Sequence, residues 1–221
     1  MMESKEFIAL WKTQNAKIDE VIAVNQALLE RLTHQKAKNA LRGLSNLKKA
    51  GIVSFVLYLL FLGYGLQYGL RHYSSDWNYF MVAVMAITLI NIKGLADYIK
   101  HLNWVRAVNY DGSVVQIQQQ LSKLKLSIVD HVKVMSLQFP FFTTFYLSSS
   151  WFPQNAGLFY VIFQIVLTGS FAYLPYWLFK TPNSELLNKK WFSSMIAGSG
   201  GKSVIKAINF YKELEGFKTA L

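Results

Sequence analysis

A glycine-rich stretch near the carboxyl end has residue types that hold phosphate groups in other proteins. Gly201-Lys202-Ser203 matches the end of a phosphate-binding loop, in which a lysine and a hydroxyl residue follow a glycine. That motif also requires a glycine five residues before the last one, and position 196 is isoleucine. No strand pattern precedes the stretch. We therefore expect a flexible hinge before a final helix rather than a nucleotide site.

The histidines are the other residues that could support metal or acid–base chemistry. They are His34, His72, His101 and His131. No pair has the spacing of metal ligands, and Asp130 would point away from His131 on a helix. The chain has no cysteine, which excludes disulfides, thiolate catalysis and thiolate metal sites. We expect solvated histidines and a non-enzymatic protein with no catalytic, cofactor-binding or metal-binding residues.

Four stretches of the chain are apolar enough to cross a bilayer, which takes about 20 mostly apolar residues. They cover about residues 51–70, 77–96, 134–152 and 157–179. The third is the weakest, since it contains Gln138, Pro140 and a run of serines. The pattern predicts an all-α, polytopic membrane protein with four transmembrane helices, embedded in the lipid bilayer.

The distribution of positive charge predicts the orientation. All but one of the 23 Lys and Arg residues lie within 1–50, 93–133 and 180–221, and the exception is Arg71. Cytoplasmic loops of membrane proteins collect Lys and Arg. We therefore expect a multi-pass protein of the cytoplasmic (inner) membrane with both termini in the cytoplasm. This placement accounts for the net charge of +11 without direct binding to nucleic acid.

The segments outside the spans carry apolar stripes at helical spacing. We divide the chain into a cytoplasmic amphipathic helix at 1–50, a transmembrane domain at 51–179 with a helical cytoplasmic loop at 97–133, and C-terminal helices at 180–221. The loop should turn near residue 111, and Asn183 is a candidate helix cap. One stripe comprises Val114, Ile117, Leu121, Leu124, Ile128 and Met135. We expect these stripes to bury one another in a cytoplasmic helical bundle.

Residues 5–47 predict one long helix with a coiled-coil-like seam. Apolar residues alternate at spacings of three and four, and Asn25 occupies an inward position that can fix register. One interpretation is that the seam contacts a cytoplasmic partner protein. The alternative is that it packs against another helix of the same chain. The candidate partner-binding residues are Phe7, Trp11, Ile18, Val21, Leu28 and Leu32.

Two stretches resemble a family of membrane proteins. They are the opening run Phe7–Ile18 with Asn25–Leu29, and the closing run from Gly201-Lys202-Ser203 to Phe210. Both are similar to uncharacterised bacterial four-span membrane proteins that are often encoded beside extracytoplasmic-function sigma factors. The resemblance implies an anti-sigma-like regulator whose partner is a sigma factor. It carries over no catalytic residues, and the absence of cysteine departs from the zinc-binding anti-sigma class.

Two other functions stay open at the level of sequence. One is a small transporter or channel component for a neutral solute, with a polar path lined by Gln67, Asn91, Gln138 and Gln164. The other is a structural or assembly subunit that forms only homo-oligomers.

Overall fold

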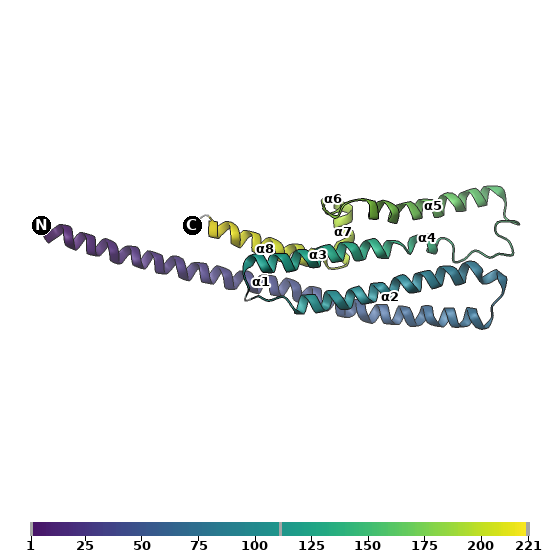
Figure 1. The fold of residues 1–221 in the computed structure, drawn as a ribbon, viewed down its shortest axis with the longest axis horizontal. Coiled ribbons are helices and arrows are strands. Elements are labelled where there is room, and N and C mark those ends of the chain that lie inside the picture. Colours follow the sequence, from purple (N-terminus) through teal and green to yellow (C-terminus); the bar gives the residue numbers. More distant parts are fainter. Residues whose placement is uncertain (1, 111, 220–221) are drawn as a thin grey trace.

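The computed structural model describes residues 2–110 and 112–219, and all regular structure in these ranges is helical. This confirms the all-helical fold class. Most helices in this part of the chain run along one long axis (Figure 1). In chain order they are α1 (Met2–Arg71), η1 (Ser75–Trp77), α2 (Asn78–Arg106), α3 (Val114–Ser136), α4 (Phe139–Phe142), α5 (Leu158–Lys180), α6 (Asn183–Asn188), α7 (Lys190–Gly198) and α8 (Gly201–Thr219).

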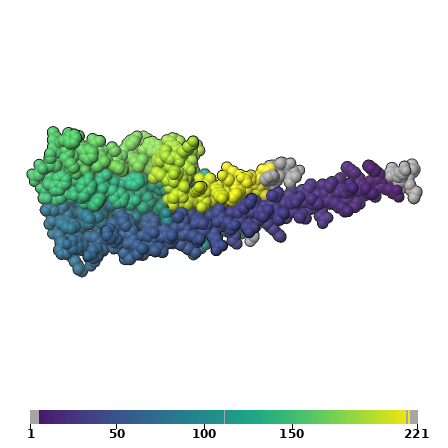
Figure 2. Space-filling model, turned by 180° about the vertical axis from the view of Figure 1, so that it is seen from behind, coloured from purple at the N-terminus to yellow at the C-terminus, as the bar shows by residue number. Residues whose placement is uncertain are grey.

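Helix α1 joins the predicted amphipathic helix to the first apolar stretch without a break. It contains 70 residues and no proline, so no residue within it lacks the backbone N–H needed for helix continuation. Its N-terminal end extends beyond every other helix (Figures 1 and 2). The predicted boundary at residue 50 is therefore a change in side-chain character rather than an end of secondary structure.

Among the described residues, three helical segments are long and apolar enough to span a membrane: Glu6–Arg71, Ser75–Arg106 and Leu158–Lys180. They contain the first, second and fourth predicted spans. Large apolar side chains on them are exposed, as shown by exposed fractions of 71% for Phe61 and 85% for Phe159. In water such a surface would be costly, and it is typical of helices that face lipid.

The prediction of a third transmembrane helix at 134–152 is wrong as stated. Helix α3 ends at Ser136, the four-residue α4 follows, and turns then continue toward α5. Pro140 supplies no backbone N–H and disfavours helical geometry at the residue before it. Hydroxyl groups bond to the nearby backbone instead, since Thr143 Oγ1 donates to the Pro140 carbonyl at 2.7 Å. The segment is a broken helix that runs beside the others (Figure 1).

Apolar residues of α3, α7 and α8 pack together with the middle of α1, whereas the stripe of the outer part of α1 stays exposed. We call this unit the helical bundle; it contains the middle of α1, the end of α2, and α3, α7 and α8. Figure 2 shows α8 lying along α1. Its fully or nearly fully buried residues include Leu41 and Leu44 of α1, Ile117, Leu121, Leu124 and Ile128 of α3, Phe192 and Ile196 of α7, and Val204, Ala207 and Tyr211 of α8.

The ends of the shorter helices fix how they enter the bundle. Ser113 caps α3 in a reciprocal pair with Gln116, while the turn predicted at residue 111 lies outside the described residues. Pro182, not Asn183, occupies the position before α6, so the predicted cap is wrong by one residue.

The glycine break lies between α7 and α8. There Gly200 has a φ of +94° and lies against the side chain of Leu44. A helix, not a strand, precedes Gly201-Lys202-Ser203, which agrees with a hinge.

Candidate functional site

The six predicted partner-binding residues all lie exposed along one face of α1. Their exposed fractions are Phe7 72%, Trp11 60%, Ile18 54%, Val21 58%, Leu28 53% and Leu32 43%. We call this face the seam. The alternative prediction, that the seam packs against another helix of the same chain, is wrong for the described residues. An isolated helix gains little stability from propensity alone, so an apolar face of this length is suited to a partner.

The bundle uses the opposite side of α1. Leu32 and the buried Leu41 are nine residues apart, which is two and a half helical turns, so they point in opposite directions. His34, on the bundle side, makes an edge-on ring contact with Tyr211 of α8 at 5.6 Å between centroids. Farther out, the side opposite the seam carries small exposed residues such as Ala16 and Ala23. The seam and the folded core therefore do not compete for the same residues.

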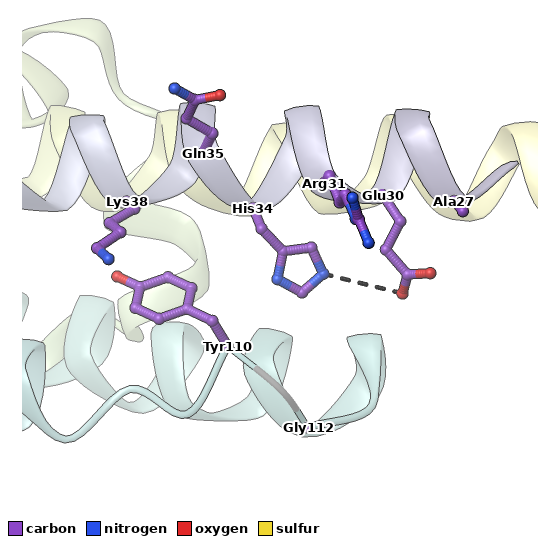
Figure 3. Close-up of a pocket in the computed structure, with 8 residues that line it drawn as sticks. All are labelled: Ala27, Glu30, Arg31, His34, Gln35, Lys38, Tyr110 and Gly112. Carbon is purple, nitrogen blue, oxygen red and sulfur yellow. Dashed lines mark ion pairs between the residues drawn. The ribbon is translucent and has the colours of Figure 1, made fainter. Parts of the chain in front are cut away.

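A polar pocket of about 620 Å³ lies at the base of the projecting half of α1. It is formed between α1 and the connection from α2 to α3 (Figure 3). His34 Nε2 lies 3.8 Å from Glu30 Oε1, and the Tyr110 hydroxyl is turned toward Lys38 (Figure 3). Burial raises the pKa of Tyr110, so its hydroxyl stays protonated at neutral pH. Glu30, Arg31, His34 and Lys38 are the charged or titratable residues of α1 that line the pocket, which lies on the bundle side of α1 and not on the seam.

A second group of polar side chains lies where α1, α2 and α3 meet, at the bundle end of the apolar segments. Its buried members, which lie outside the four predicted spans, are Lys48, Asp97, His101 and His131. Asp97 Oδ1 lies 2.5 Å from Lys93 Nζ and 3.7 Å from Lys100 Nζ, and Asp97 Oδ2 lies 3.5 Å from His131 Nδ1. Lys48 Nζ is 3.7 Å from the centroid of the Tyr98 ring. We call Lys48, Lys93, Asp97, His101 and His131 the junction cluster.

Burial controls the charges in the junction cluster. It lowers the pKa of His101 to about 3 and that of His131 to about 4, and Lys48 acts in the same direction. Burial also lowers the pKa of Lys48 to about 7, against the attraction of Asp97. Burial opposes ionisation of Asp97, but Lys93, His131 and Lys100 lower the pKa of that carboxyl. At neutral pH the carboxylate is therefore ionised and both imidazoles are neutral.

The expectation of solvated histidines is wrong for two of them. His101 is fully buried and His131 is 3% exposed, because α2 and α3 pack directly on each other. His101 Nε2 lies 3.0 Å from Ser127 Oγ of α3. The sequence does contain a signal for this arrangement, since Lys93, Asp97 and His101 recur every four residues, and so do Ser127 and His131. Pairing α2 with α3 required the structure.

The described residues contain no group of three or more His, Asp or Glu side chains placed to hold a metal ion. In the junction cluster, His131 of α3 contacts Asp97 of α2, and Lys48 of α1 lies over the Tyr98 ring of α2.

The structure brings two of the four amides predicted to line a solute path together, Asn91 and Gln138, and not the other two. Asn91 Nδ2 donates to Gln138 Oε1 at 3.1 Å, which ties α2 to the broken segment. Gln164 bonds elsewhere, donating to Thr168 Oγ1 at 3.1 Å and accepting from the Tyr146 hydroxyl at 2.9 Å. Gln67 is exposed on α1. The Asn91–Gln138 and Tyr146–Gln164 bonds tie the broken segment to α2 and α5, the common role of amides in apolar helix bundles.

Comparison with protein-family models, with curated proteins and with solved structures gives no match to this chain.

Proposed function

We propose that this protein is a non-enzymatic integral membrane protein that holds a binding helix in the cytoplasm. In this proposal α1, α2, the broken segment and α5 cross the inner membrane. The helical bundle and both termini lie on the cytoplasmic side, where nearly all Lys and Arg residues would then be. The seam of α1 binds a cytoplasmic protein.

The observation that carries the proposal is the exposure of a whole apolar face on a projecting helix. Trp11 is 60% exposed and lies far from the bundle, and large aromatic residues of this kind dominate binding energy in protein interfaces. Amphipathic helices bind by laying such a face into a groove of the partner.

A sigma factor of the extracytoplasmic-function class is the first partner to test, because the resemblance of the two terminal stretches implies an anti-sigma-like role. In this role the seam would hold the sigma factor at the membrane and keep it from the polymerase. The chemistry required of the partner is an apolar groove that accepts one long helix.

Site-specific photocrosslinking of the full-length protein in cells tests the proposal. A photoreactive phenylalanine is placed at Trp11 or Leu28 of the seam, and matched controls carry it at Ala16 or Ala23 on the opposite side. We expect adducts with one defined cytoplasmic protein from the seam positions only. Trp11→Ala together with Leu28→Ala should then weaken the affinity of the purified pair by roughly 30-fold or more, as for a central interface residue.

Other outcomes separate the remaining functions. Seam adducts with the mass of two copies of this chain, and no others, would assign the protein to a self-associating assembly subunit. Absence of any adduct from Trp11 and Leu28 would overturn partner binding through the seam. Transport of a solute that is lost when Asn91, Gln138 and Gln164 are replaced would favour the transporter instead.

A further inference from the structure

An apolar groove of about 710 Å³ lies between α2, the broken segment and α5. Among the residues that line it are Leu89, Ile90, Pro140, Phe141, Pro175 and Phe179. No charged side chain lines it. The groove exists because the chain between α3 and α5 is not a regular helix and leaves space between α2 and α5. Its lining residues come from the middle of α2 and from the end of α5 nearest to the helical bundle. In the proposed topology that end of α5 lies on the cytoplasmic side.

A cation marks one end of this groove. Tyr176 lines the groove, and Lys180 Nζ lies 5.8 Å from the centroid of the Tyr176 ring. Lys180 is exposed and is the last residue of α5. Among the ion pairs described, none involves Lys180. The site therefore combines an apolar groove with a solvent-accessible ammonium group at one end of the groove.

The surroundings of Lys180 place it at the depth of lipid headgroups. Trp177 contacts Trp191 of α7 at 5.9 Å between ring centroids, and Lys189 Nζ lies 4.4 Å from the Trp177 ring. Trp, Tyr and Lys gather at the membrane–water interface because one end of each side chain is apolar and the other polar. Helix α7 runs across the long axis of the molecule at this level (Figure 1), as an interfacial helix does.

Contacts with α3 hold the end of α5 in place. Lys133 Nζ donates to the Thr181 carbonyl at 3.0 Å, and Asn183 Nδ2 donates to Asp130 Oδ1 at 3.1 Å. The chain just after Lys180 is thus bonded to a second helix. Because the end of α5 is already held in place, a ligand that binds at Lys180 has less conformational freedom of the chain to remove.

We propose that this groove binds one anionic phospholipid of the inner leaflet, with an acyl chain along Leu89, Phe141 and Pro175 and the phosphate at Lys180. This inference rests on the proposed membrane function. The apolar lining matches a hydrocarbon chain, and the ammonium matches the charge of the headgroup. Basic pockets at the cytoplasmic ends of transmembrane helices are suited to such lipids.

Native mass spectrometry of the purified full-length protein, titrated with phosphatidylglycerol or phosphatidylcholine, tests the proposal. We expect one phosphatidylglycerol per chain at low lipid concentration. Lys180→Gln should weaken that binding about fivefold, the ratio expected for one lysine near a headgroup, and leave phosphatidylcholine unchanged. Lys202→Gln, an exposed lysine of α8, is the matched control and should bind like the wild type.

A second pair of variants tests the groove itself. Ala172 lines the groove, so Ala172→Phe should fill it and reduce binding of both lipids, whereas Val166→Phe on another side of α5 should not. Circular dichroism and gel filtration establish that each variant is folded. Since Ala172 and Leu89 are both exposed, Leu89→Trp provides an independent way to obstruct the groove.

Three results would overturn the lipid site: equal effects of Lys180→Gln and Lys202→Gln, unchanged lipid binding by both groove variants, or displacement of phosphatidylglycerol by inorganic phosphate. Carbonate extraction of membranes separates this failure from that of the proposed function. Protein released by carbonate would contradict membrane insertion. Retained protein that binds no lipid would contradict this inference alone.

Discussion

Lys48 shows how the fold sets the charge of one side chain. Its ammonium group is fully buried and has no hydrogen-bond partner among the described residues, although it lies over the Tyr98 ring. A cation over an aromatic face recovers only part of the hydration energy that burial removes. The pKa of Lys48 is consequently lowered to about 7, so that folding is opposed by its protonation.

Replacing Lys48 by methionine should therefore stabilise the protein. The folded pKa lies below the unfolded one, so the cost of burying the charge is fully present below pH 7 and disappears as the pH rises toward 10.5. We expect Lys48→Met to raise the free energy of unfolding by about 1–4 kcal/mol at pH 6, and by less at pH 9. Thermal unfolding in detergent measures this. Lys49→Met, at the exposed neighbouring position, should show neither effect.

The buried histidines should make the protein sensitive to acid. The pKa of His101 is lowered to about 3, so the unfolded chain binds this proton first and stability falls as the pH drops from 6.5 toward 3. His101→Gln should remove about 1.4 kcal/mol of this loss per pH unit within that window. Unfolding midpoints at several pH values between 7 and 4.5 provide the test. An unchanged slope, equal to that of the exposed control His72→Gln, would contradict the burial of His101.

At the scale of elements, the turn between α7 and α8 sets how α8 returns along α1. Gly200 adopts a φ of +94°, and a Cβ there would collide with Leu44 Cδ1. Gly200→Ala should lower the free energy of unfolding by about 1–3 kcal/mol, because both the backbone and the contact are unfavourable for a side chain. Gly198→Ala is the control, since its Cβ would meet open space. Equal melting temperatures for the two variants would be inconsistent with this packing.

The elements also show what spacing alone can and cannot predict. The stripe of Ile117, Leu121 and Leu124 is buried as its helical period predicts, because period reports which side of a helix is apolar. The seam containing Trp11 has the same kind of period but is exposed. The hydrophobic period of a helix does not identify which neighbouring element, if any, covers the apolar side. In α1 the neighbour α8 lies along the side opposite the seam. The third span was predicted too simply, since hydropathy does not register the effect of Pro140 on helix continuity.

At the scale of the whole molecule, the absence of cysteine allows a direct test of the number of crossings. Single cysteines at Ser75 or Asn155 should react with an impermeant maleimide in intact cells, whereas cysteines at Ser122 or Ser184 should react only after permeabilisation. All four positions are exposed. If the broken segment does not cross, Ser122 and Asn155 will lie on the same side and Ser184 on the opposite side. That pattern would reduce the proposed four crossings to three.

The unbroken course of α1 has a mechanical consequence. At a rise of about 1.5 Å per residue, its 70 residues form a rod about 105 Å long. The outer end of this rod carries Trp11, and its other end forms the wall of the first candidate span. Since no loop separates the two ends, a twist or tilt imposed on the outer end is conveyed as torque to the span. Under the proposed function, occupancy of the seam would thereby be coupled through a single backbone to the packing of the helices that cross the membrane.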